Sequence, residues 1–314
     1  MARKEGALDL TAVDSVISRV PGSPHDHHLL TGLLLGLPAG LEPSGGWAPE
    51  SSTLASSTFA SSTPASSTTA LSTPVCPDSA QHPVAIVFPY RNRMAQLTGV
   101  LGRLVPMLRQ QGLCFVIFVV EQAGQTDLPF NKGRLINAGF LEAERRFPLA
   151  CFIVHDTDLV PLHPDQPYSC QSAGQADSLV VEHLGVRTHN ARFQLPYPTL
   201  IGGVLKFSRL AFQRVNGFSN EYWGWGLEDD DMELRLREAS LQLRRPYWAT
   251  SIYFHQQHDR QMIFSNNGSM RQKLLGSARN RMLKDGLNNL NYTLIGVHET
   301  WLYTHLLLDV GRPP

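Results

Sequence analysis

Four consecutive carboxylates, Glu228 to Asp231, follow the sequence Trp-Gly-Trp-Gly at 223–226 after one leucine. Adjacent carboxylates repel one another, so a fold that keeps four needs a helix N-terminus, a cation or a bound partner to offset the charge. Aromatic faces beside hydrogen-bonding carboxylates suit a sugar, which has an apolar C–H face and a rim of hydroxyls. A simpler interpretation is the acidic first turn of a helix, because Met232, Leu236 and Ala239 continue at helical spacing. The two interpretations are compatible.

A second group of residues has the chemistry of a metal site. Asp156 and Asp158 flank Thr157 behind an apolar stretch, and alternation along an extended segment would send both carboxylates to one side, where they invite a divalent cation. His255 and His258 follow another apolar stretch and would face one point if the segment were helical or turned. Carboxylate and imidazole together suit Mn²⁺ or later first-row ions better than Ca²⁺. Each pair alone is also common as ordinary polar residues, and their occurrence together favours the metal.

The elements that position these groups alternate between strand and helix. The expected order is a strand at 84–88, a helix at 94–112 kinked at Pro106, a strand at 114–120, a helix at 131–147 and a strand at 150–154. This alternation predicts βαβ units, and therefore an α/β fold with a largely parallel sheet. Such sheets bind ligands at the carboxyl ends of their strands. Arg91 and Arg93 follow the first strand at that edge, and arginine suits phosphate oxygens.

The N-terminal quarter of the chain has a different composition. Residues 51–74 repeat Ser-Ser-Thr-X-Ala, which buries too little apolar surface to fold, so residues 1–82 are predicted to be a disordered leader and Ser/Thr-rich stem. An O-glycosylated stalk and a plain linker share this composition. Residues 83–314 are predicted to form the folded domain. Two sequons occur near its end, Asn267-Gly268-Ser269 and Asn291-Tyr292-Thr293.

The overall composition excludes some partners. The 27 basic residues cancel the 27 acidic ones and no Lys/Arg run occurs, so no nucleic-acid partner is expected. No stretch reaches the roughly 18 apolar residues of a membrane span. Membrane association is therefore expected only through an anchor missing from this chain.

Collinear motifs from about residue 82 to the end resemble the β-1,4-galactosyltransferase family of inverting glycosyltransferases. They include FPYRNR (88–93), FNKGRLINAGF (130–140), HDTDLVP (155–161), LPYPTLIGG (195–203), NGFSNEYWGWGLEDDD (216–231) and LYTHLLLDVG (302–311). The resemblance implies a GT-A fold, a nucleotide-sugar-binding α/β core with a metal at its Asp-X-Asp and a mobile tryptophan loop. It also implies Mn²⁺ as the cofactor, UDP-Gal or UDP-GalNAc as the donor, a GlcNAc-terminated glycan as the acceptor and the Golgi lumen as the location.

The resemblance assigns roles position by position. Asp229 corresponds to the catalytic base. Asp158, His255 and His258 correspond to the metal ligands, although many members carry methionine at the place of His255. The donor-binding positions are Pro89, Arg91, Arg93, Phe130, Asp156, Thr157, Leu200, Gly203 and Trp225. The acceptor-binding positions are Tyr197, Trp225, Gly226, Glu228, Asp229, Asp230 and Arg271.

Leu200 departs from the family in a way that bears on the donor. Galactose-transferring members carry tyrosine there, and members that accept an N-acetylgalactosamine donor tend to have a smaller aliphatic residue. Removing a phenol opens room for an acetamido group and removes a hydrogen-bond partner. The sequence therefore leads to the hypothesis that UDP-GalNAc is used at least as well as UDP-Gal.

Other positions match the family only in part. A lysine of the donor region has no counterpart near Asn190, and Arg192 is the cation that would compensate. Cys151 and Cys170 match a family disulfide, whereas Cys76 matches a half-cystine whose N-terminal partner is not evident.

Two rival functions are weighed against a transferase. One is a catalytically inactive sugar-binding protein on the same fold. The other is a metal-dependent hydrolase that uses the aspartate and histidine ligands, although such a hydrolase would give the Trp-Gly-Trp-Gly loop no role.

Overall fold

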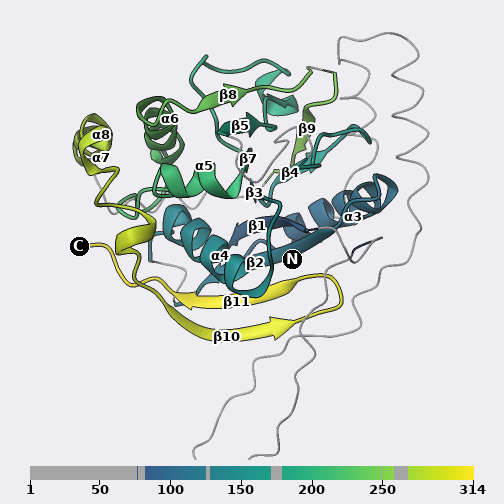
Figure 1. Ribbon diagram of the computed structural model, residues 1–314, viewed down its shortest axis with the longest axis horizontal. Coiled ribbons are helices and arrows are strands. Elements are labelled where there is room, and N and C mark those ends of the chain that lie inside the picture. The colour runs from purple at the N-terminus through teal and green to yellow at the C-terminus, as the bar shows by residue number, and fades with distance from the viewer. Residues whose placement is uncertain (1–75, 77–81, 125–127, 171–178, 248, 258–267) are drawn as a thin grey trace, which may run out of the picture.

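The computed structural model describes residues 76, 82–124, 128–170, 179–247, 249–257 and 268–314. Its centre is an eight-stranded sheet in the order β10-β11-β2-β1-β3-β7-β5-β8 (Figure 1). The strands are β1 (Val84–Tyr90), β2 (Phe115–Gln122), β3 (Cys151–His155), β5 (Val180–His183), β7 (Val204–Phe207), β8 (Gln242–Arg244), β10 (Thr293–Glu299) and β11 (Thr304–Asp309). A smaller sheet joins β4 (Leu159–Pro161), β9 (Ile252–His255) and β6 (Arg187–Thr188).

Helices pack against both faces of the large sheet. The described helices are α3 (Met94–Gln110), α4 (Lys132–Arg146), α5 (Arg209–Arg214), α6 (Glu228–Glu238), α7 (Gly268–Gly276) and α8 (Ala278–Arg281), with single 3₁₀ turns η2 (His189–Ala191) and η3 (Leu287–Asn289). Helix α3 packs on one face of the sheet, and α4, α5 and α6 pack on the other. Within the described ranges, none of these helices is long and apolar enough to span a membrane.

The strand directions confirm the predicted α/β class. The central strands β11, β2, β1 and β3 are parallel neighbours, whereas β7 runs antiparallel to both β3 and β5. At the far edge, β10 returns antiparallel beside β11. The parallel centre follows from the helical crossovers through α3 and α4 that the sequence predicted.

The apolar run of β1 shows why this strand lies at the centre. Val84, Ile86 and Phe88 pack into one core with α3, whereas Ala85 and Val87 pack into a second core with α4, α5 and α6. Every residue of the strand is buried. A strand covered on both faces needs apolar side chains at every position, as its sequence has.

Strand β2 and helix α3 end at other residues than predicted. Strand β2 continues to Gln122, whose side chain donates to the Pro129 carbonyl at 3.0 Å and accepts from the Asn131 amide at 2.8 Å. This residue holds the turn that leads into α4. Helix α3 runs through Pro106 and ends at Gln110, two residues before Gly112.

The fold contains two disulfides, and one of them pairs Cys76 with a partner that was not predicted. Cys151 is bonded to Cys170, as the family resemblance implied. Cys76 is bonded to Cys114, so the partner that was sought toward the N-terminus lies instead at the entrance of β2. Cys114 lies beside the start of β1, because the Val84 amide donates to its carbonyl at 2.9 Å.

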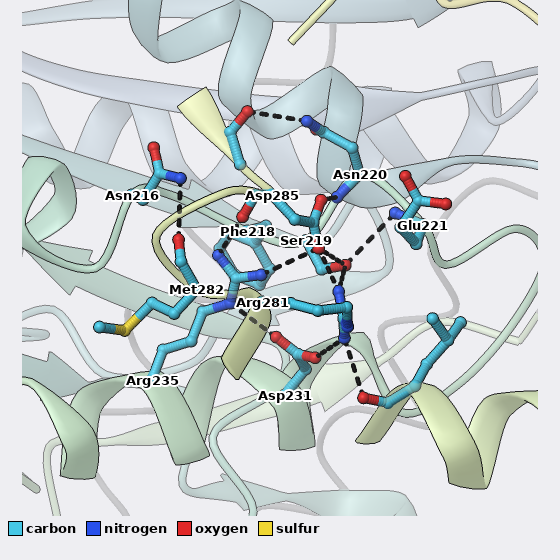
Figure 2. A network of polar contacts seen from close by, with 12 residues as sticks. Asn216, Phe218, Ser219, Asn220, Glu221, Asp231, Arg235, Arg281, Met282 and Asp285 are labelled. Carbon is cyan, nitrogen blue, oxygen red and sulfur yellow. Dashed lines mark hydrogen bonds and ion pairs between the residues drawn. The ribbon is translucent and has the colours of Figure 1, made fainter. Parts of the chain in front are cut away.

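A buried polar network joins α6 to α8 (Figure 2). Asp231 is fully buried and accepts from Arg235 Nε at 2.6 Å, from Arg281 Nη2 at 2.6 Å and from the Tyr222 hydroxyl at 2.9 Å. Arg235 also pairs with Asp285 at 3.1 Å. The last carboxylate of the acidic run therefore serves the fold.

The substitution Asp231→Asn is expected to lower the free energy of unfolding by about 3 kcal/mol, because it removes the buried carboxylate that Arg235 and Arg281 share and leaves Asp285 as their remaining carboxylate. Urea denaturation followed by circular dichroism measures the change. The control is Glu238→Gln on the same helix, an exposed residue whose pair with Arg279 is also exposed, with an expected change within about 0.5 kcal/mol. Equal stabilities for the two variants would contradict the structural role of Asp231.

Candidate active site

A cavity of about 430 Å³ opens where β1 and β3 end, beside the start of α6. Most of the predicted site residues line it: Pro89, Arg91, Arg93, Phe130, Asp156, Thr157, Asp158, Leu200, Gly203, Trp225, Glu228, Asp229 and His255. The sequence analysis missed other wall residues, namely Lys132, Leu159, Gly185, Val186, Thr188, Asn190, Ala191, Pro196, Gly202 and Gly224. The predicted base and two of the three predicted metal ligands therefore share one cavity.

Asp158 and His255 converge in the cavity wall. The Asp158 Oδ2 atom lies 3.4 Å from His255 Nε2. The small sheet sets this distance, because β4 follows Asp158 directly and pairs Leu159 with His255. The Gln256 amide donates to the Asp158 carbonyl at 2.8 Å, and the His255 amide donates to His189 Nδ1 at 2.9 Å.

One expectation about the local geometry of these ligands was wrong. Strand β3 ends at His155, and the next three residues form a turn, so strand alternation does not set the directions of the two aspartates. Asp156 faces Lys132 at 3.1 Å, whereas Asp158 faces His255. His255 lies at the end of strand β9. The convergence of the two histidines stays a prediction, because His258 lies outside the described residues.

The donor atoms of this pair fit a first-row divalent ion. One carboxylate oxygen and one imidazole nitrogen are the mixed ligands that Mn²⁺ tolerates. Within the described residues, no group of three or more His, Cys, Asp or Glu side chains is placed to hold a metal. The third predicted ligand, His258, lies outside the described residues.

Lys132, in the first turn of α4, joins the two acidic parts of the cavity. Its Nζ atom lies 3.1 Å from Asp156, 3.3 Å from Asp229 and 3.7 Å from Glu228. Burial alone would lower the pKa of Lys132, but the three carboxylates outweigh it and raise that pKa well above its ordinary value. The lysine therefore stays charged and offsets part of the acidic run.

The sequence motif that contains Lys132 could have indicated a role for this residue, which was not among the predicted site residues. The residue follows Phe130-Asn131 inside a family motif and opens a predicted helix. Arg192, the cation expected to compensate for the missing lysine near Asn190, is exposed and lies outside the cavity wall. Lys132 supplies that charge from another element.

Asp229 is held at the start of α6 by close backbone packing. A side chain on Gly202 would bring its Cβ within 2.5 Å of Asp229 Oδ2, so the glycine makes room for the carboxylate. Lys132 donates to both Asp229 oxygens, at 3.4 and 3.3 Å. This close approach explains the Gly-Gly pair before β7.

Glu228 is buried beside Asp229, with 7% of its surface exposed. Burial raises the pKa of Glu228 to about 7, with the Asp229 charge adding to the rise and Lys132 opposing it. Among the described residues, its Oε2 atom has no hydrogen-bond partner. A buried oxygen without a partner is costly unless a ligand supplies the donor.

The prediction that cations and a helix N-terminus offset the acidic run is confirmed. Lys132 meets Glu228 and Asp229, and two arginines meet Asp231. The Tyr197 hydroxyl donates to Asp230 at 3.0 Å. All four carboxylates lie in the first turn of α6, where the helix dipole favours negative charge.

The tryptophan loop places its two indoles differently. Trp223 is fully buried, whereas Trp225 is 64% exposed and lines the cavity. Gly224 and Gly226 take φ angles of 84° and 101°, which favour glycine. Buried Arg271 donates to the carbonyls of Trp223, Trp225 and Gly226, so it fixes the backbone of this loop.

Several predicted acceptor positions lie outside the cavity wall. They are Tyr197, Gly226, Asp230 and Arg271. Tyr197 and Asp230 bond to each other, and Arg271 bonds to the loop backbone. Their contacts with an acceptor stay predictions.

Two arginines and an aromatic ring form another part of the cavity wall. Arg91 donates to the Leu128 carbonyl at 2.6 Å, and its guanidinium lies 5.2 Å from the centre of the Phe130 ring. Arg93 lines the cavity directly before α3. This part of the wall brings positive charge to the cavity that Asp229 and Glu228 also line.

The sheet with this cavity at its carboxyl edge is of the GT-A type, because the chain superposes on a solved galactosyltransferase. Two family models match the chain, one described as the N-terminal region of glycosyl transferase group 7 over residues 54–171 and the other as the N-terminal domain of galactosyltransferase over residues 182–259. A crystal structure of a Drosophila β-1,4-galactosyltransferase 7 variant in complex with manganese, UDP-Gal and xylobiose superposes with a TM-score of 0.62 and 30% identity, over 74% of this chain and 95% of that chain. The chain belongs to the β-1,4-galactosyltransferase family.

Curated relatives support the same assignment. Human β-1,4-galactosyltransferase 1 is 37% identical over 232 residues, which are 74% of this chain and 56% of the relative. Rat β-1,4-galactosyltransferase 4 is 38% identical over 226 residues, which are 72% of this chain and 63% of the relative. The chain thus spans 56% to 63% of the length of these two relatives.

Proposed function

We propose that this protein is an inverting, metal-dependent glycosyltransferase that moves galactose or N-acetylgalactosamine from a UDP-sugar to O4 of a terminal GlcNAc or related sugar. The observation that carries the proposal is the single cavity shared by Asp229, Asp158 and His255. The family supports the reaction type, and the Drosophila relative was crystallised with manganese, UDP-Gal and a sugar acceptor.

Asp229 is the proposed general base. Its carboxylate lines the cavity and is held by Lys132 and by the approach to Gly202. It takes the proton of the acceptor hydroxyl as that oxygen attacks the anomeric carbon. The bond from C1 to the diphosphate breaks, the new C1–O4 bond forms on the opposite face, and the sugar passes through an oxocarbenium-like state.

Glu228 is proposed to orient the acceptor. Its buried Oε2 atom lacks a partner among the described residues and belongs to the cavity wall. A sugar hydroxyl would satisfy this oxygen and would hold the neighbouring hydroxyl near Asp229. The binding of a sugar acceptor would thus remove the cost of an unpaired buried oxygen.

The diphosphate of the donor would lie against the positive wall. Arg91 and Arg93 are suited to its oxygens. Asp158 and His255, with His258 as the predicted third ligand, would hold Mn²⁺, which when bound offsets the charge of the leaving UDP. Trp225 would cover the sugar and exclude water, whose attack would hydrolyse the donor.

Leu200 is proposed to make the cavity tolerant of UDP-GalNAc, because a leucine leaves room that a tyrosine would fill. The substitution Leu200→Tyr is expected to raise the ratio of kcat/KM for UDP-Gal to that for UDP-GalNAc about tenfold, the size of a steric change in one pocket. Initial rates with both donors give this ratio. The control is Leu210→Tyr, on α5 and outside the cavity wall. A strong UDP-Gal preference in the unmodified protein would refute the hypothesis.

The proposed function is tested by measuring UDP release from purified protein with and without a GlcNAc acceptor. A transferase releases UDP only with the acceptor and yields a β-1,4-linked disaccharide that NMR identifies. Release without acceptor would indicate the hydrolase, and no release would indicate the sugar-binding protein. The Golgi lumen is the proposed location, and the two disulfides are typical of an oxidising compartment.

A further inference from the structure

At the far edge of the large sheet lies a strand whose apolar side chains no other described residue covers. Strand β10 is the last in the strand order, so within the described residues it pairs only with β11 (Figure 1). Leu294, Ile295 and Val297 are 36%, 55% and 43% exposed. Edge strands with exposed apolar residues are templates for pairing with other chains, and proteins normally protect them with charge, proline or a cover.

The protection that is usual at an edge is weak on β10. The four residues from Leu294 to Val297 are uncharged and include no proline. The pairing with β11 does shift register between Leu294 and Gly296, but a bulge does not remove the exposed side chains. A cover is therefore the remaining device.

A sequon lies at the start of this strand. Asn291 and Thr293 are both exposed, and Thr293 is the first residue of β10. Between them, Tyr292 points inward, because its hydroxyl donates to Glu142 at 2.6 Å and accepts from Arg145 at 2.9 Å. These bonds anchor the middle residue on α4 and leave the acceptor asparagine facing solvent.

We propose that Asn291 carries an N-linked oligosaccharide that covers the apolar edge strand β10. The step transfers an oligosaccharide from a lipid-linked diphosphate sugar to Asn291 Nδ2. The bond between C1 and the diphosphate oxygen breaks, the C1–N bond forms, the amide nitrogen loses one proton to a base, and the lipid diphosphate leaves. Because the sequon adjoins the strand, the sugar lies beside Leu294 and Ile295.

The modification is tested on the full chain behind a cleavable secretory leader in cultured animal cells. Release of the oligosaccharide with a glycosidase in ¹⁸O water converts a modified asparagine to labelled aspartate, which peptide mass spectrometry assigns. The label is expected at Asn291, with complete loss in Asn291→Gln and in Thr293→Ala and retention in Thr293→Ser. An unlabelled Asn291 in the secreted, folded protein would overturn the proposal, whatever the state of Asn267.

The covering role has a separate readout. Sedimentation velocity is expected to show the glycosylated protein of natural sequence as a monomer. The Asn291→Gln variant is expected to sediment at twice that mass or more. Adding Ile295→Lys and Val297→Lys to Asn291→Gln is expected to restore the monomer, because charge replaces the cover. Circular dichroism confirms folding of each variant. If the Asn291→Gln variant sediments as the glycosylated protein of natural sequence does, the covering role is refuted.

Discussion

The substitution Asp229→Asn is expected to lower kcat about 10³-fold, because an amide cannot take the proton of the attacking hydroxyl. Asparagine keeps the shape of the side chain, so the close approach to Gly202 is preserved. The loss should therefore appear in kcat while the KM for the donor changes little. Initial rates at saturating donor and acceptor measure it.

The control for this loss is Glu238→Gln, at the other end of the same helix and outside the cavity wall. Its kcat is expected to match that of the unmodified protein. An Asp229→Asn variant that keeps more than about a tenth of the normal kcat would mean that another group takes the proton. Because the only change is from carboxylate to amide, the result depends on chemistry and not on packing.

Removal of the metal is expected to lower the transfer rate about 10³-fold or more, since the charge of the departing diphosphate would then lack its largest offset. The protein is dialysed against a chelator, its metal content is checked by mass spectrometry, and rates are measured before and after Mn²⁺ is returned. Return of Mn²⁺ is expected to restore the rate fully. A metal-free protein that transfers at the normal rate would contradict the assignment of Asp158 and His255.

A further variant tests whether His255 contributes to the choice of metal. His255→Met restores the residue that many family members carry, and the softer thioether is expected to change the order of preference among divalent ions. Activation curves with Mn²⁺, Co²⁺ and Mg²⁺ for the two proteins measure that order. Superimposable curves would show that His255 does not contact the ion.

The centre of the fold could be predicted because its signals are local. The run from Val84 to Phe88 is apolar at every position, which only a strand covered on both faces requires. The acidic run could likewise be placed at a helix start, since the residues behind it repeat at helical spacing. In both cases the neighbouring residues carry the signal.

What could not be predicted depends on partners distant in sequence. Lys132 meets Asp156 and Asp229 across the cavity. The motif around the lysine marks the residue, but nothing in the local sequence indicates which carboxylates it contacts. Asp231 looks like its three neighbours in sequence, yet α8 supplies the arginine that makes it structural. The bond between Cys76 and Cys114 also joins segments that only the sheet brings together.

The central claim is that Asp158 and His255 bind the metal and that Asp229, in the same cavity, acts as the base and does not bind the metal. Electron paramagnetic resonance titration of Mn²⁺ in the presence of UDP tests it on the unmodified protein, Asp158→Asn and Asp229→Asn. We expect Asp158→Asn to lose Mn²⁺ and UDP binding together, and Asp229→Asn to bind both normally while transferring sugar about 10³-fold more slowly. Normal Mn²⁺ binding by Asp158→Asn, or its loss in Asp229→Asn, would contradict this division.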